Sequence, residues 1–196
     1  MSTQTPSKAL STVTTAALFA FGLATSASAA EYTRVDTASS RITFKYTQMG
    51  VGMDGHFERF GASILFDPAR LEAARASFEL QLDSIDTGLT EANEDVKGKI
   101  WFDTAAHPVA TFKSSGFKAL GDNRYEVSGT LTIKGRSRNV SAPFTLTPAD
   151  KAADVNGTFT LKRSDFAIGE GEWADVVILA DEIRIAFQLR ALHGAQ

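Results

Sequence analysis

Residues 123–146 read NRYEVSGTLTIKGRSRNVSAPFTL, with apolar and polar side chains alternating on both sides of a short basic turn. In the first half every second position belongs to one set: Tyr125, Val127, Gly129, Leu131 and Ile133. Strands have a period of two, so these residues share one face. Gly135 can adopt the positive φ that a tight hairpin turn needs, and alternation then resumes at Val140, Ala142, Phe144 and Leu146. The pattern predicts a β-hairpin with one apolar face, which needs partner strands because a lone hairpin is marginally stable.

The rest of the chain supplies similar segments. Further strands are expected at residues 32–36, 41–46, 60–66, 76–82, 109–115, 155–161 and 183–189. Two short helices are expected at residues 67–74 and 90–102, and a glycine-rich turn that folds over apolar groups at residues 48–55. One-sided strands are typical of antiparallel sheets, and a last strand closing on the first would hide both edges. We therefore predict an all-β fold, an antiparallel eight-stranded lipocalin-like barrel with one or two short helices.

The first thirty residues have the features of a secretory signal peptide. Lys8 is the one charged side chain before Glu31, and residues 13–24 form an apolar run that is too short to span a bilayer. Small residues at Ala27-Ser28-Ala29-Ala30 predict cleavage after Ala29 or Ala30. The alternative is a membrane anchor. Cleavage would leave a single domain, residues 31–196, located in the periplasm.

Composition excludes several classes of function. Without Lys8 the mature chain has 19 basic and 23 acidic side chains, a net charge of −4, which gives no indication of nucleic-acid binding. The chain has no cysteine, which excludes thiol catalysis, disulfides, thiolate metal sites and a lipoprotein anchor.

The polar residues suggest little catalytic chemistry. His56, His107 and His193 lack metal-ligand spacing and are interpreted as surface residues, so no metal or cofactor is assigned. Residues 165–182 are rich in carboxylates, which are interpreted as a solvated rim, although Asp165 or Glu172 could serve an enzyme as an acid. The segment 169–174 matches G-x-G-x-x-A but lacks the βαβ setting of a dinucleotide site. A basic turn with Lys134, Arg136 and Arg138 could contact phosphate or simply keep the hairpin soluble.

The aromatic residues carry the main functional signal. Fourteen Phe, two Trp and three Tyr fall mostly on the apolar faces. An eight-stranded barrel either fills itself with side chains or holds one small ligand, and the sequence leaves both open.

Several segments together resemble the YceI family of exported, lipocalin-like proteins. The matching segments are residues 44–50 with Gly55-His56-Phe57, Phe66-Asp67-Pro68, 84–88, Trp101-Phe102-Asp103 with 108–112, 129–135 leading to Val140, and 163–166 before Ile168-Gly169. The resemblance implies an elongated hydrophobic pocket that holds a long isoprenoid or similar amphiphile, a periplasmic location, and homodimers in some members. Our hypothesis is a carrier whose cavity is lined by Phe44, Tyr46, Met49, Phe60, Phe78, Leu80, Leu82, Trp101, Phe112 and Trp173.

The chain also departs from the family pattern. Many members have His where Gln48 stands, and an R-D-x-H-L run where this chain has Ala92-Asn93-Glu94-Asp95-Val96. The resemblance therefore carries over no head-group contacts and leaves both a diphosphate and an uncharged, quinone-like head open. Some relatives are encoded beside or fused to cytochrome b561-type membrane proteins. Two rival hypotheses remain: an enzyme acting on such a lipid, and a solid barrel serving a membrane redox system.

Overall fold

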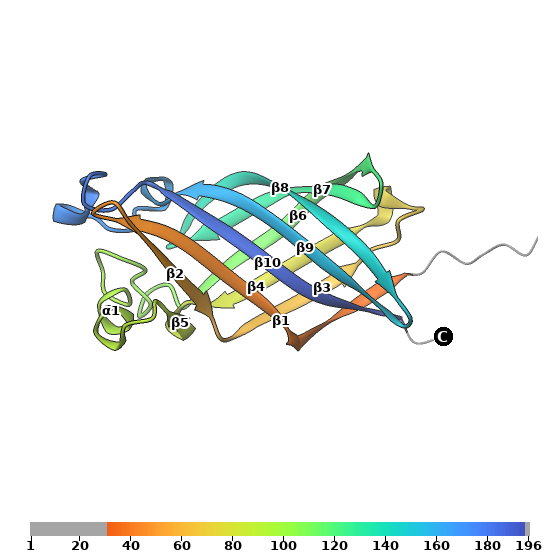
Figure 1. The fold of residues 1–196 in the computed structure, drawn as a ribbon, viewed down its shortest axis with the longest axis horizontal. Helices are drawn as coiled ribbons and strands as arrows, with labels where there is room; N and C mark the ends of the chain where they lie inside the picture. The colour runs from red at the N-terminus through yellow and green to blue at the C-terminus, as the bar shows by residue number, and fades with distance from the viewer. Residues whose placement is uncertain (1–30, 195–196) are drawn as a thin grey trace, which may run out of the picture.

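A computed structural model describes residues 31–194. The predicted signal peptide, residues 1–30, lies outside the described residues. Ten strands form one antiparallel sheet in the order β3-β4-β6-β7-β8-β9-β10-β1-β2-β5 (Figure 1). Their bounds are β1 Tyr32–Gln48, β2 Val51–Phe57, β3 Phe60–Leu65, β4 Arg75–Gln81, β5 Ile85–Asp86, β6 Val109–Gly121, β7 Arg124–Ile133, β8 Arg136–Ala149, β9 Ala152–Lys162 and β10 Glu182–His193. The all-β, antiparallel prediction is confirmed, with ten strands in the described part of the chain instead of eight.

The central hairpin forms as the alternation predicts. β7 and β8 pair from Arg124↔Thr145 to Ile133↔Arg136 without a register shift. Lys134 and Gly135 both have positive φ, 49° and 69°, the combination found in the two-residue turns whose twist matches the flanking strands.

The sheet curls far enough that β1 contacts both the last strand, β10, and the chain that follows β3. β10 pairs with β1 over Tyr32↔His193 to Lys45↔Arg184, so the last strand closes on the first as expected. The beginning of β1 also meets the end of β3, where Tyr32 and Phe66 exchange two backbone hydrogen bonds of 2.9 Å. The result is an elongated, curled sheet (Figure 1), and apolar side chains from its strands line the space inside it.

Three local predictions need correction. Residues 32–36 and 41–46 belong to one long strand, β1, with a register shift between Asp36 and Arg41. The expected turn at residues 48–55 is confined to Met49-Gly50, because residues from Val51 onward pair with β1 as β2. Sequence alternation is weak there because glycines occupy three of the positions, and pairing with β1 supplies the order instead.

The two predicted helices are shorter than expected. At residues 67–74 there is a 3₁₀ turn, Leu71–Ala73, because the Asp67 carboxylate accepts hydrogen bonds from the Ala69 N–H and the Arg70 side chain and forms a local turn. The helix α1 covers Thr90–Asp95, and turns around Gly98 replace its second half. The remaining 3₁₀ segments are Leu82–Ser84, Arg163–Phe166 and Gly171–Ala174.

Candidate ligand cavity

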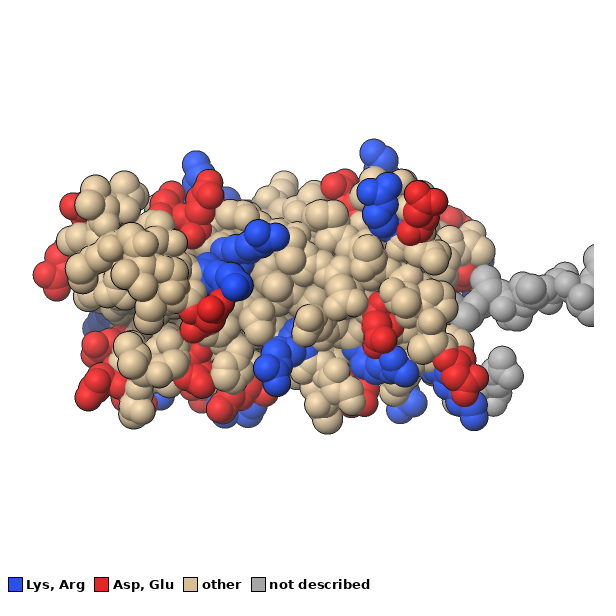
Figure 2. All heavy atoms as spheres, viewed as in Figure 1, with Lys and Arg blue, Asp and Glu red and all other residues tan. Residues whose placement is uncertain are grey.

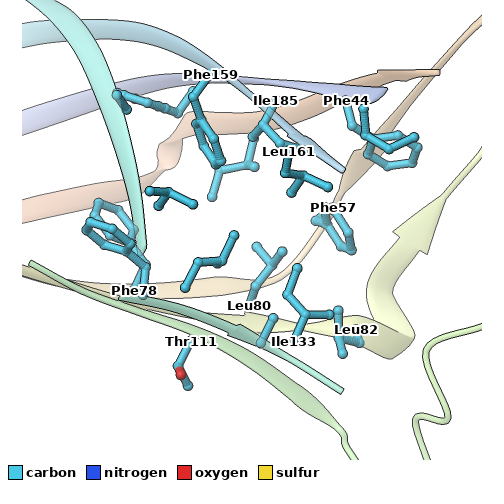
Figure 3. Close-up of a pocket in the computed structure, with 18 of the residues that line it drawn as sticks. Phe44, Phe57, Phe78, Leu80, Leu82, Thr111, Ile133, Phe159, Leu161 and Ile185 are labelled. Atoms are coloured by element: carbon cyan, nitrogen blue, oxygen red, sulfur yellow. The ribbon is translucent and has the colours of Figure 1, made fainter. Parts of the chain in front are cut away.

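The inner face of the sheet encloses a cavity of about 640 Å³. This volume falls in the range of roughly 300–1,000 Å³ that small-molecule pockets occupy. Most of the side chains that line it are apolar, and they come from facing walls. Figure 3 shows Phe44, Phe57, Phe78, Leu80, Leu82, Ile133, Phe159, Leu161 and Ile185 around one space. Thr111 lies on the same wall, but its side chain points away. The barrel is therefore hollow, and its walls offer a ligand mainly hydrocarbon and aromatic contacts.

Glycines opposite phenylalanines help to keep this space open. Phe44 stands opposite Gly55, and Phe187 opposite Gly157, in paired strands. A Cβ on either glycine would overlap the facing ring, and at Gly157 it would also come within 2.8 Å of the Pro143 carbonyl oxygen. A Cβ on Gly129 would likewise overlap the Phe112 ring, which reaches it diagonally because Gly129 pairs with Ser114. These rings therefore lie flat against the wall, over glycine backbone. Any larger residue in place of the glycine would push the ring into the cavity.

Aromatic side chains close the end of the barrel where Tyr32 and His193 lie, and Phe66, Phe117 and Phe144 among them also line the cavity there. The Phe66 ring lies 5.4 Å from Phe117, 5.3 Å from Tyr125 and 5.9 Å from Phe144, measured between ring centroids. Tyr125 stacks on Phe144 at 5.5 Å. Phe66, Tyr125 and Phe144 are each less than a tenth exposed. We call Phe66, Phe117, Tyr125 and Phe144 the aromatic plug.

Loops cover the opposite end, which also carries α1 (Figure 1). There Trp101, from the turns after α1, contacts Trp173 in the segment Gly171–Ala174, with ring centroids 5.3 Å apart. Among the cavity-lining residues at this end, Asp95, Ile100 and Glu172 are exposed. The cavity therefore reaches solvent here, and we call this end the mouth.

One buried cation organises the loop that covers the mouth. Arg163 is 2% exposed, and its guanidinium donates to the carbonyl oxygens of Ile168, Gly169, Leu179 and Ala180 at 2.7–3.1 Å. Burial lowers the pKa of Arg163, but a guanidinium stays charged at any physiological pH. The side chain thus joins both halves of the 163–181 loop from inside. Sequence reasoning missed this role; the signal available was an Arg directly after an apolar strand.

Two further polar contacts fix the same loop. The Lys134 ammonium, from the central hairpin turn, donates to the Ala167 carbonyl at 2.8 Å and the Glu170 carboxylate at 2.9 Å, and this lowers the pKa of Glu170. Asp181 accepts hydrogen bonds from the backbone N–H and the hydroxyl of Ser164. Burial opposes ionisation of Asp181, but these bonds outweigh it and its pKa is lowered. Lys134 of the basic turn therefore stabilises the 163–181 loop of the protein itself.

Eight of the ten predicted site residues line the cavity: Phe44, Tyr46, Phe78, Leu80, Leu82, Trp101, Phe112 and Trp173. Burial raises the pKa of the Tyr46 hydroxyl, so it remains a neutral donor. Met49 does not line the cavity: it lies at the tip of the β1–β2 hairpin and is 69% exposed. Phe60 does not line it either, since it packs into the core beside the wall. Whether the eight bind a ligand remains a prediction.

The carboxylates considered for catalysis are not brought together. Asp165 lies 3.6 Å from Arg138 on the outside of the barrel, whereas Glu172 is at the mouth. Within residues 31–194, no three His, Asp or Glu side chains are grouped as metal ligands would be. In that same range, no helix is long and apolar enough to cross a bilayer.

The profile of the YceI-like domain matches residues 33–191, almost all of the described chain. The chain belongs to the YceI family. Among curated YceI relatives, a UPF0312 protein of Azotobacter vinelandii is 28% identical over 73% of this chain and 81% of its own length. A UPF0312 protein of Ectopseudomonas mendocina is 31% identical over 65% and 70%.

Solved YceI-like structures share the fold. The crystal structure of BcnA from Burkholderia cenocepacia is 40% identical, with a TM-score of 0.77, and covers 80% of this chain and 99% of that one. A polyisoprenoid binding domain from Saccharophagus degradans is 17% identical, with a TM-score of 0.65, covering 84% and 99%. At that identity the second likeness shows the fold alone.

The positions that the resemblance predicts to differ from many YceI members lie together on the cavity wall. Gln48, Ala92, Asp95 and Val96 all line the cavity. At these positions this chain presents an amide, an acid and two apolar side chains to the cavity.

Proposed function

We propose that this protein is a periplasmic carrier that holds a lipophilic, isoprenoid-type molecule in its barrel. The observation that carries the proposal is the apolar cavity of about 640 Å³. Each CH₂ group that leaves water for such a space contributes about 0.8 kcal/mol. A chain of several isoprene units would therefore bind with few polar contacts, and the near-absence of polar side chains on the walls favours a ligand of that kind.

The structural neighbours support the same class of ligand. The domain from Saccharophagus degradans is described as polyisoprenoid-binding, and it shares this fold. A solid barrel acting as an accessory to a membrane redox system would need a filled interior, and the cavity argues against that rival. A homodimer and a cytochrome b561-type partner remain proposals that would add to the carrier role.

Binding is favoured over catalysis by the position of the acids. Of the two carboxylates that an enzyme would use, Asp165 faces outward toward Arg138 and Glu172 is exposed at the mouth. General acid catalysis needs the acid within hydrogen-bond reach of the reacting atom, together with a partner group. The deep part of the cavity, where most of a lipid would lie, has hydrocarbon walls.

Native mass spectrometry of protein isolated without detergent from a periplasmic extract tests the proposal. We expect a mature chain starting at Ala30 or Glu31, carrying a lipid that is released on denaturation. A chain that retains Met1 in the membrane fraction would contradict export, and a clean apo mass with no uptake of added isoprenoid would contradict binding.

A matched pair of variants sharpens this experiment. Ala142 lines the cavity on β8, and its neighbour Ser141 is exposed on the opposite face. Ala142→Phe should reduce the lipid-bound fraction because the new ring occupies the lumen, whereas Ser141→Phe should leave it unchanged. An equal lipid-bound fraction in both variants would mean that the lipid binds outside the barrel.

A further inference from the structure

The mouth of the cavity carries two carboxylates with no opposite charge against them. Asp95, at the end of α1, and Glu172, beside Trp173, line the cavity and are exposed. Neither has an ion-pair partner within residues 31–194, whereas Glu170 and Asp165 nearby do. Figure 2 shows acidic side chains gathered at this end of the molecule. An incoming head group therefore meets negative charge.

Within residues 31–194, the one cation that lines the cavity at this end is already used by the protein, and the exposed Lys99 and Arg136 do not line the cavity. Arg163 lines the cavity, but four of its five N–H groups point at backbone carbonyls of the 163–181 loop. Lys134 is held by the Ala167 carbonyl and Glu170. Lys97 pairs with Glu94, and neither Lys97 nor the exposed Lys99 lines the cavity. Arg75 lines the cavity and is exposed, but it pairs with Leu65 at the other end of β4, beside the aromatic plug and away from the mouth.

The remaining polar groups at the mouth are neutral. Gln48 lines the cavity with an amide, which both donates and accepts hydrogen bonds. The Thr87 hydroxyl already contacts the Asn93 side chain at 2.7 Å. A hydroxyl, carbonyl or amine head can be accommodated by the amide and the carboxylates, but a phosphate or diphosphate would lose water where the described lining residues of the mouth offer it no free cation.

We infer that the mouth selects the charge of the ligand's head group: it accepts neutral or cationic isoprenoid-type amphiphiles and rejects anionic, phosphorylated ones. This inference rests on the proposed function, because it concerns the head of the ligand whose tail occupies the cavity. It narrows the two head-group classes left open by the sequence to one.

Three amphiphiles with one tail test the inference: farnesol, farnesylamine and farnesyl diphosphate. Affinity is measured by titration with the protein's own fluorescence, since the chain has two tryptophans, Trp101 and Trp173, and both are at the mouth. We expect farnesyl diphosphate to bind at least tenfold more weakly than farnesol, and farnesylamine at least as tightly as farnesol. The difference in affinity between farnesol and farnesyl diphosphate should become smaller in 1 M salt, because the Debye length there is about 3 Å.

Two double variants that each remove two negative charges distinguish an effect of charge at the mouth from an effect of the protein's net charge. Asp95→Asn combined with Glu172→Gln should reduce the ratio of the affinities for farnesol and farnesyl diphosphate several-fold. Glu79→Gln with Asp150→Asn removes the same charge from the outer face of β4 and from the β8–β9 turn, and should leave this ratio unchanged.

The outcomes are distinguishable. Equal affinity for the diphosphate and the alcohol, or equal effects of the two double variants, would overturn charge selection while leaving the carrier proposal intact. Binding of none of the three compounds, with the protein folded, would overturn the carrier proposal itself and the inference with it.

Discussion

The two ends of the barrel are built from different interactions. At the aromatic plug, the chain is held by strand pairing and by four aromatic rings, with Phe66 in contact with the other three. At the mouth, loops cover the opening and are tied by polar groups, chiefly Arg163, Lys134 and Asp181. One end thus depends on apolar burial, and the other on a few directional contacts.

This difference predicts unequal stability along the molecule. A buried Phe is stabilised by roughly 1.5–3 kcal/mol of apolar transfer, and well-packed aromatic pairs add to that value. A single hydrogen bond contributes about 1 kcal/mol net, and loops with few apolar contacts open before the core does. We expect the plug to set the global free energy of unfolding, and the mouth to open locally so that a ligand can enter.

The largest expected effect is on the plug. Phe66→Ala should lower the free energy of unfolding by about 3–5 kcal/mol, because it leaves a void among three rings that are fixed by paired strands. Denaturant unfolding of the ligand-free protein measures this value.

Phe78 provides the comparison on the cavity wall. It is partly buried and has one aromatic neighbour, Phe112, at 6.4 Å. Phe78→Ala should cost less than about 2 kcal/mol, because the ring already faces empty space, and should instead weaken ligand binding. Equal losses of stability at Phe66 and Phe78 would mean that the barrel is filled in solution.

A smaller effect is expected when the mouth loop loses its internal cation. Arg163→Met keeps the bulk of the side chain but leaves four carbonyls without a donor, and each unsatisfied buried group costs about 1–3 kcal/mol. Loosening of the loop lets water reach some of them, so we expect a net loss of about 2–3 kcal/mol. Hydrogen exchange should increase in residues 163–181 and stay unchanged in β7 and β8.

Arg138→Met is the matched control. Arg138 is half-exposed and its contact with Asp165 is 3.6 Å long, so this variant should change stability by less than about 0.5 kcal/mol. If Arg163→Met increased exchange throughout the sheet, the mouth and the plug would be one cooperative unit and the comparison would fail.

Alternation along the chain was sufficient to predict most of the sheet, but not β2 or β5. The central hairpin follows from side-chain period and from Gly135, both of which are local features. The inward direction of Phe44, Phe78 and Phe112 follows in the same way, and all three line the cavity. Alternation tells which side chains face inward, but not how far apart the walls are, so a filled and a hollow barrel give the same pattern.

The mouth could not be predicted for a different reason. The residues that build it, such as Asp95, Arg163 and Glu172, come from segments far apart in the sequence and have no regular period. Met49 shows the converse error: an apolar residue in a glycine-rich segment was expected to cover the interior, but it lies at an exposed hairpin tip because Val51 onward pairs with β1.

The smallest expected effect is a loosening of the mouth in acid. Lys134 and Ser164 hold the pKa values of Glu170 and Asp181 below their ordinary values, so the ionised forms are favoured in the folded protein. Their stabilising contribution is complete at pH values above the ordinary carboxylate range near 4 and is lost as the pH falls through the lowered values. Dissociation of farnesol should therefore speed up a few-fold between pH 6 and pH 3, while the sheet remains folded.

Quenching of the mouth tryptophans separates this effect from general acid unfolding. Trp101 and Trp173 should become more accessible to acrylamide at the pH where dissociation speeds up, before far-ultraviolet circular dichroism changes. In Lys134→Met, Glu170 has lost its cation and its pH-dependent contribution, so the tryptophans should already be more accessible at pH 6 and their accessibility should change less in acid. If tryptophan accessibility and circular dichroism changed together in both proteins, the polar ties at the mouth would be as strong as the aromatic plug, and the two ends would not differ in stability.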